Sequence, residues 1–172
     1  MANIPYVIET TDDACREFAA NSTGMKWLMA HELGHGINGD CGTPETMLER
    51  AQAEVRGERH FIPTNTREYL AHYMGAILFG NPREYAEIAA TLKSLPYDET
   101  PDSFYDEDER YPTRPELSAA LSKWADQLEK AKAIDENGKI IDLEKAINLF
   151  RGANRVTIQG TTSTQASLEI TN

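Results

Sequence analysis

The chain has 172 residues, and its 28 acidic and 17 basic side chains give a formal net charge of −11 at pH 7. This length predicts a single domain that is large enough to bury a hydrophobic core. The negative charge disfavours binding to nucleic-acid phosphates, and no apolar segment approaches the length of a membrane-spanning helix. We therefore expect a globular domain with neither a nucleic-acid nor a membrane partner.

The cysteine count and the first residues bear on the compartment. The two cysteines, Cys15 and Cys41, are too few for a disulfide framework and fit a reducing environment. Residues 1–5 contain no basic region followed by an apolar stretch, so no cleaved secretory signal is expected. The predicted localisation is cytoplasmic, and an effector exported without a cleaved signal would have the same pattern.

The first elements of the chain are short. Residues 4–9 include the apolar run Tyr6-Val7-Ile8 and predict a strand, and residues 11–20 predict a short helix. A longer helix is expected from about Gly24, with an apolar stripe of Met25, Met29 and Leu33 toward the core. The opposite side of that helix carries His31 and His35.

The helix contains the sequence His31-Glu32-Leu33-Gly34-His35, which is an HExxH arrangement. Two histidines four residues apart project from one face of a helix, so their rings can bind one zinc ion. The glutamate after the first histidine is placed to take a proton from the zinc-bound water. The sequence therefore predicts His31 and His35 as zinc ligands, Glu32 as the general base and Zn²⁺ as the cofactor.

A zinc site of this kind needs a third protein ligand, and Glu68 is the predicted one. Residues 67–79 predict a helix with Glu68, Ala71, His72 and Gly75 on the side away from its apolar stripe. Small residues beside a glutamate allow close approach to another helix, as a shared metal site requires. The apolar stripe consists of Leu70, Tyr73, Met74 and Ile77.

These two motifs resemble those of the gluzincins, the zinc peptidases with two histidines and one glutamate as ligands. In neprilysin-like members the third ligand opens a Glu-x-x-Ala-Asp pattern, and Glu68 and Ala71 match it. His72 stands where the family has an aspartate that hydrogen-bonds a zinc-binding histidine, so the chain departs from the pattern there. The resemblance covers two short motifs and implies a zincin-like fold and peptidase activity.

Two other residues remain candidates for the third ligand. Glu54, in a helix predicted over residues 44–59, follows the second histidine at a separation typical of gluzincins with compact sites. Cys41 falls where the metzincins, a sister group, have the last ligand of HExxHxxGxxH. His60 and His72 are expected to be ordinary histidines, and His72 is the better candidate for supporting a ligand.

The implied reaction is hydrolysis of a carbonyl compound by water that zinc activates. Glu32 would accept a proton from the water and pass it to the leaving amine. One more donor would stabilise the developing oxyanion, and the sequence does not choose among four residues. These are Tyr69, Tyr73, His60 and His72.

Turn and capping signals organise the following part of the chain. Asn81 is the predicted N-cap of a helix over residues 82–95, with Glu84 placed for a capping box. Residues 98–112 are acidic and aromatic and predict a linker loop, or a lid with Phe104 and Tyr105 on the substrate. A second capping box, Thr113 to Glu116, predicts a long amphipathic helix.

The last part is expected to contain one more helix and a tail. Asn137-Gly138 predicts a turn between helices, and Ala133 in the first ligand position argues against an EF-hand loop. Asp142 is the expected cap of the last helix. Residues 155–172 are rich in Thr and Ser and predict a weak β-hairpin or a disordered tail.

We therefore expect a mainly α protein, with α+β possible if residues 4–9 and the tail form a minimal sheet. Residues 1–154 would be a compact metallopeptidase-like domain that hydrolyses a peptide bond in a specific protein target. The alternatives are a non-enzymatic acidic helical module that binds a basic protein partner, and a zinc amidase. No oligomeric state is predicted.

Overall fold

A computed structural model of the chain describes residues 16, 22–40, 44–57, 62–91 and 109–159, and these residues form helices without a strand. The predicted mainly α fold is confirmed for this part of the chain. The expected strand at residues 4–9 and the tail beyond residue 159 lie outside the described residues. The helices are α2 (Ser22–Asn38), α3 (Pro44–Val55), α4 (Thr64–Phe79), α5 (Pro82–Thr91), α6 (Arg114–Lys130) and α7 (Leu143–Gln159).

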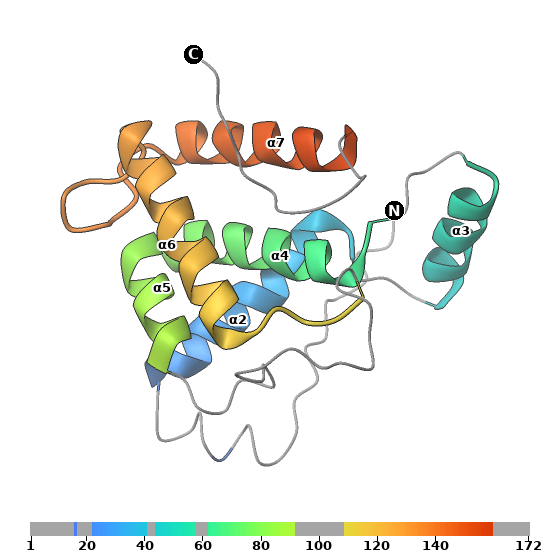
Figure 1. Ribbon diagram of the computed structural model, residues 1–172, viewed down its shortest axis with the longest axis horizontal. Coiled ribbons are helices and arrows are strands. Elements are labelled where there is room, and N and C mark those ends of the chain that lie inside the picture. The colour runs from blue at the N-terminus through green and yellow to red at the C-terminus, as the bar shows by residue number, and fades with distance from the viewer. Residues whose placement is uncertain (1–15, 17–21, 41–43, 58–61, 92–108, 160–172) are drawn as a thin grey trace.

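Helix α4 is the centre of the molecule. It contacts α2, α5, α6 and α7, and its most extensive contact is with α2. In Figure 1, α7 runs along one side of α4 and α2 crosses obliquely behind it, while α5 and α6 lie toward one end. Because it has neighbours on several sides, α4 is buried along almost its whole length, including the polar residues Glu68 and His72.

The contact between α2 and α4 is close because small residues face each other across it. A Cβ atom added to Gly34 would lie 2.2 Å from the backbone oxygen of Ala71. A Cβ atom added to Gly75 would lie 3.1 Å from the backbone oxygen of Ala30 and 2.7 Å from the Tyr85 hydroxyl. The two backbones therefore meet at distances that no larger residue permits, as expected for the small side of residues 67–79.

The aromatic core fixes α5 and α6 against this helix pair. Trp27 of α2 and Trp124 of α6 are almost fully buried, and their indole N–H groups donate to the backbone oxygens of Tyr85 and Tyr73. Burying two indoles with satisfied N–H groups gives large apolar area without an orphaned donor. Both tryptophans thereby link helices that are distant in the sequence.

The predicted caps are present. The Asn81 side chain accepts from the backbone N–H of Glu84, and Thr113 and Glu116 form a complete capping box. Asp142 accepts from the backbone N–H of Lys145 at the start of α7. Each cap satisfies an N–H group that the helix itself leaves unpaired.

The orientation predicted for α2 is wrong. Its histidine side faces α4 and is buried, whereas Met29 and Leu33 of the predicted apolar stripe are 38% and 44% exposed and Met25 alone of the three packs against the core. The close approach at Gly34 decides this orientation, since only the side that carries small residues fits against α4. The histidines therefore lie in a helix interface.

The last helix is longer than expected. Residues 155–159 belong to α7, so Val156 and Ile158 are helical and do not begin a strand. Before α7, the predicted Asn137-Gly138 turn is present, with Gly138 at φ +79° and the Asp135 side chain accepting from the backbone N–H groups of Asn137 and Lys139. A single antiparallel bridge joins Ile134 and Ile140 across this turn.

Helix α3 stands apart from the other helices in Figure 1, and its residues Met47, Leu48 and Val55 are exposed. It ends at Val55, before residue 59 where its end was predicted. Within the described ranges, no helix combines the length and the apolar character that crossing a bilayer requires.

Candidate metal centre

The side chains of His31, His35 and Glu68 meet at the interface of α2 and α4. The Nε2 atom of His31 lies 3.4 Å from one carboxylate oxygen of Glu68, and the Nε2 atom of His35 lies 3.4 Å from the other. All three side chains are largely buried, with relative exposures of 7%, 13% and 8%. The structure thus brings together the three residues that the two motifs singled out.

The ring orientations separate two possible ligand sets. His31, Glu68 and His72 offer ligand atoms within 4.8 Å of one another, so distance alone selects His72 and leaves His35 out of the group. The rings of His31 and His72 are stacked, however, with centroids 3.9 Å apart and planes 21° apart. An imidazole lone pair lies in the plane of its ring, so two stacked rings do not aim at one ion. The rings of His31 and His35 meet at 74°, which allows their lone pairs to converge.

Asp40 supports His35 from the side opposite to Glu68. Its carboxylate oxygen lies 3.1 Å from Nδ1 of His35, and its backbone N–H donates to the backbone oxygen of His35. A carboxylate at Nδ1 fixes the ring and leaves the Nε2 lone pair for a metal. Asp40 was not among the site residues predicted from the sequence, although it follows the second histidine by five positions at a helix end, with Gly39 at φ +76°.

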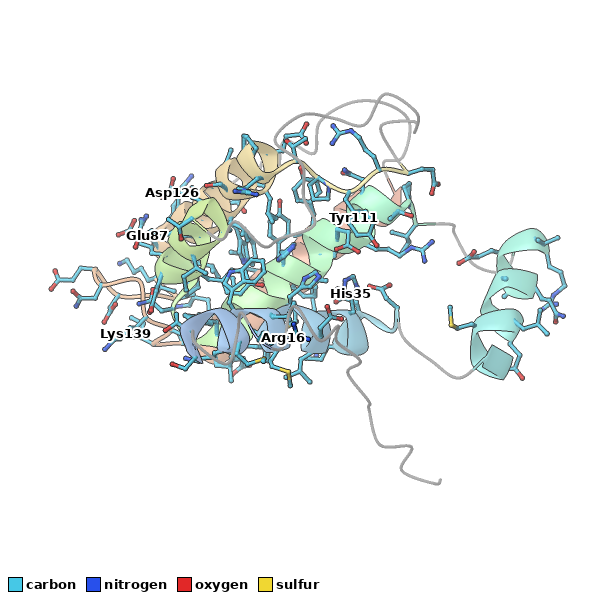
Figure 2. All side chains as sticks on the ribbon, turned by 90° about the horizontal axis from the view of Figure 1, so that it is seen from below. Arg16, His35, Glu87, Tyr111, Asp126 and Lys139 are labelled. Atoms are coloured by element: carbon cyan, nitrogen blue, oxygen red, sulfur yellow. The ribbon has the colours of Figure 1, made fainter. Side chains whose placement is uncertain are left out.

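Glu32 lies at the edge of this cluster. Its carboxylate is 4.0 Å from Nε2 of His31 and is about one-third exposed, so water can reach it. Tyr111, which is labelled with His35 in Figure 2, is 55% exposed. The pKa of Tyr111 is raised by burial and by the negative charges of Glu68 and Glu32, which places its hydroxyl within electrostatic range of the cluster.

In the metal-free cluster, hydrogen bonds with neighbouring side chains determine whether Glu68 and His35 are charged. Burial raises the pKa of Glu68, but hydrogen bonds from His31 and His35 outweigh it and lower the value to about 2. Burial likewise lowers the pKa of His35, and hydrogen bonds to Asp40 and Glu68 raise it to about 9. Without a metal, Glu68 is therefore ionised and His35 is protonated at neutral pH. A metal cation that takes the place of this proton would be attracted by the same two carboxylates, those of Asp40 and Glu68.

The other residues predicted from the sequence lie elsewhere or outside the described part of the chain. Glu54 lies on α3, which stands apart from α2 and α4 in Figure 1, whereas Glu68 contacts both histidines of the motif. Tyr73 packs against Trp124, and burial raises the pKa of its hydroxyl to about 12. Cys41, His60 and residues 92–108, which include most of the expected lid, lie outside the described residues.

The spacing between Glu68 and each histidine of the motif can be compared with that of donors around a zinc ion. Ligand atoms at the bond lengths of protein zinc sites, about 2.0–2.1 Å, lie about 3.3 Å apart around a tetrahedral ion. The two contacts of Glu68 with the histidine nitrogens, 3.4 Å each, are close to that spacing. Two imidazoles and one carboxylate also leave one position for water, as in catalytic sites.

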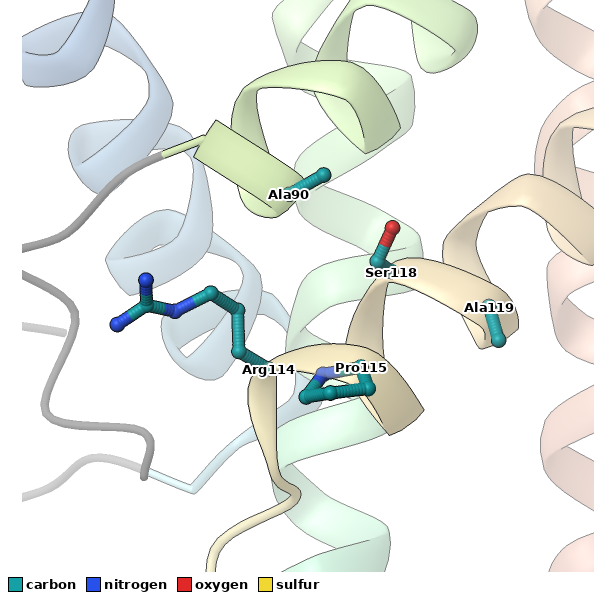
Figure 3. A pocket seen from close by; sticks show the side chains of 5 residues that line it. All are labelled: Ala90, Arg114, Pro115, Ser118 and Ala119. Atoms are coloured by element: carbon teal, nitrogen blue, oxygen red, sulfur yellow. The ribbon is translucent and has the colours of Figure 1, made fainter. Parts of the chain in front are cut away.

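A concave surface lies between α5 and α6, away from this cluster. The groove in Figure 3 runs between α5 and α6 and contains none of the cluster residues. Its lining combines the small side chains Ala90, Ser118 and Ala119 with Arg114 and Pro115. A ligand site normally converges several polar groups on an apolar pocket, and this groove has one charged residue at its edge.

Comparison of the chain with protein-family models, with curated proteins and with solved structures found no match.

Proposed function

We propose that the chain is a zinc-dependent hydrolase that cleaves a peptide bond in a protein substrate. The observation that carries the proposal is the position of the Glu68 carboxylate, 3.4 Å from Nε2 of both histidines of the HExxH motif. His31, His35 and Glu68 would hold the ion, and Asp40 would orient His35. Bound zinc supplies a water whose pKa is near 7 and polarises a carbonyl oxygen.

Glu32 is the proposed general base. It neighbours His31 on the same helix, and it is the exposed carboxylate of the cluster, whereas Glu68 is buried between the histidines. An ionised carboxylate in contact with water can accept a proton and later give it to the departing amine. The buried carboxylate binds the ion and the exposed one transfers protons, so the two glutamates have separate roles.

The proposal predicts that Glu32→Gln abolishes hydrolysis and leaves metal binding intact. The amide side chain has the shape of the carboxylate but cannot accept the proton, so the rate on a peptide library should fall at least about 100-fold. Zinc content, measured by mass spectrometry after dialysis, should remain about one ion per chain. Glu87→Gln is the matched control, because Glu87 is an exposed glutamate on α5, away from His35 in Figure 2. Hydrolysis by Glu32→Gln at the wild-type rate would overturn the assigned role, and intact biological function without hydrolysis would favour the acidic binding module.

The third ligand is tested by Glu68→Gln compared with Glu54→Gln. Loss of the Glu68 charge should weaken zinc binding by at least about tenfold, because the ion then keeps two neutral imidazoles as its protein ligands. Glu54→Gln makes the same charge change on α3 and should bind zinc like the wild type. Chelator competition gives both affinities, and a loss confined to Glu54→Gln would move the ligand to α3.

A further inference from the structure

The two histidines of the motif are held in different ways. His35 is fixed at its edge, because Nδ1 of its ring lies 3.1 Å from the Asp40 carboxylate. His31 has no such support: its Nδ1 is buried and has no hydrogen-bond partner among the described residues. A ring bound to a metal at one nitrogen needs some restraint on its rotation, because the lone pair follows the ring plane.

That restraint comes from aromatic rings. His72 of α4 lies flat against His31 with centroids 3.9 Å apart, and the nearly parallel ring of Trp27 has its centroid 6.2 Å from that of His31. His72 is fully buried and cannot turn freely, because its Nδ1 lies 3.1 Å from the hydroxyl of Tyr85. Tyr85 is in turn stacked on Trp27, with centroids 4.8 Å apart. His31 thus borders a packed cluster of three rings from α2, α4 and α5, in which Trp27 and Tyr85 are stacked and His72 is tilted to them by 41° and 60°.

We infer that His72 is a positioning residue that orients His31 for the metal by stacking on the face of its ring. This inference rests on the proposed function, since it assigns a role toward the proposed zinc ion. It accounts for the departure at residue 72, where a hydrogen-bonding aspartate is replaced by a flat ring. His72 itself is excluded from the ligand set by the same stacking, which turns its lone pairs away from the ion that His31 would bind.

The inference separates the flat shape of His72 from its nitrogen atoms. His72→Phe keeps an aromatic ring of similar thickness and removes both nitrogens. His72→Leu keeps apolar volume and removes the ring. Tyr85→Phe removes the hydroxyl next to Nδ1 and keeps the stack with Trp27. Tyr85→Phe therefore removes only the hydrogen bond, His72→Phe removes the nitrogens together with that hydrogen bond, and His72→Leu removes the ring as well.

The measurement is the affinity for Zn²⁺ and Co²⁺ by chelator competition, together with the visible absorption spectrum of the Co²⁺ form. We expect His72→Phe to bind within about threefold of the wild type with the same spectrum, and Tyr85→Phe likewise. We expect His72→Leu to lose about 10–100-fold in affinity, the range for residues that orient a ligand, and to shift the Co²⁺ bands.

Two outcomes would overturn the inference. Wild-type affinity and spectrum in His72→Leu would show that stacking does not position His31. An equal loss in His72→Phe and His72→Leu would assign the role to a nitrogen of His72. If His72→Leu does not fold, the Phe variant still decides between ring and nitrogen.

Failure of the proposed function can be distinguished from failure of the inference about His72. A wild-type protein that binds Co²⁺ without hydrolysing peptides would end the peptidase proposal and leave the positioning test intact. If the wild type binds no metal, the ring-proton NMR shifts of His31 in the metal-free protein report the stack directly. Shifts that are unchanged in His72→Leu would then refute it.

Discussion

Gly34 determines how closely α2 can approach α4. A Cβ atom at this position would lie 2.2 Å from the backbone oxygen of Ala71, and a backbone atom cannot move aside as a flexible side chain can. Gly34→Ala should therefore separate the two helices and lower the free energy of unfolding by about 3 kcal/mol or more. Urea denaturation of the metal-free protein measures this loss, and zinc affinity should fall with it because Glu68 moves away from the histidines.

Gly152 provides the matched control. It also lies within a helix, α7, but it is exposed and a Cβ atom added there would meet nothing within 4 Å. Gly152→Ala should raise the free energy of unfolding by about 0.5–1 kcal/mol, since alanine loses less backbone entropy on folding. Equal stability of the two alanine variants would contradict the close approach of α2 to α4.

At the scale of the element, the start of α6 is held by one glutamate. Glu116 accepts from Arg110 in two hydrogen bonds of 2.8 Å each, and from the backbone N–H and the hydroxyl of Thr113. The hydrogen bonds with Arg110, partly opposed by burial and then assisted by Thr113, lower the pKa of Glu116 to about 2. The side chain is 38% exposed, so water screens much of this interaction.

The lowered pKa of Glu116 predicts how the free energy of unfolding changes as the pH falls. Because the folded-state pKa lies below the ordinary value, the stabilisation is present above about pH 4.5 and is lost as the pH falls toward 2. Glu116→Gln should therefore lower the unfolding free energy by about 1 kcal/mol near pH 6 and make little difference near pH 2. Glu144→Gln, an exposed glutamate in the first turn of α7, is the control. A Glu116→Gln deficit that is as large at pH 2 as at pH 6 would rule out the ionised carboxylate as its cause.

Local signals predicted the helix starts, and a nonlocal contact decided how α2 is oriented. Asn81, Thr113 and Asp142 cap the helices that follow them because a cap depends on residues three positions away. The exposed position of Met29 and Leu33 was not predictable from periodicity, since two sides of α2 were plausible core faces. The choice depended on Gly34 meeting Ala71, which are far apart in the sequence.

At the scale of the whole molecule, the candidate site was predictable where a motif encodes it. His31 and His35 lie on one helix at a fixed spacing, and Glu68 was inferred from the small residues around it. The side chains that contact each histidine from the side could not be predicted from a motif. Asp40 reaches His35 through the geometry of a helix end, and His72 reaches His31 only because α2 and α4 cross at their small residues.

Helix α3 lies in the sequence between α2 and α4, the two helices that would share the proposed ion. The chain leaves α2 after His35, forms α3, and returns to α4 at Glu68, so an ion bound to both would cross-link the two ends of this excursion. A metal ion that binds the folded chain and not the unfolded chain stabilises the fold by mass action, so its contribution grows with the free metal concentration. The ion would thus act as a reversible tether around α3, the helix that stands apart in Figure 1, and a chelator would release that tether in the folded protein.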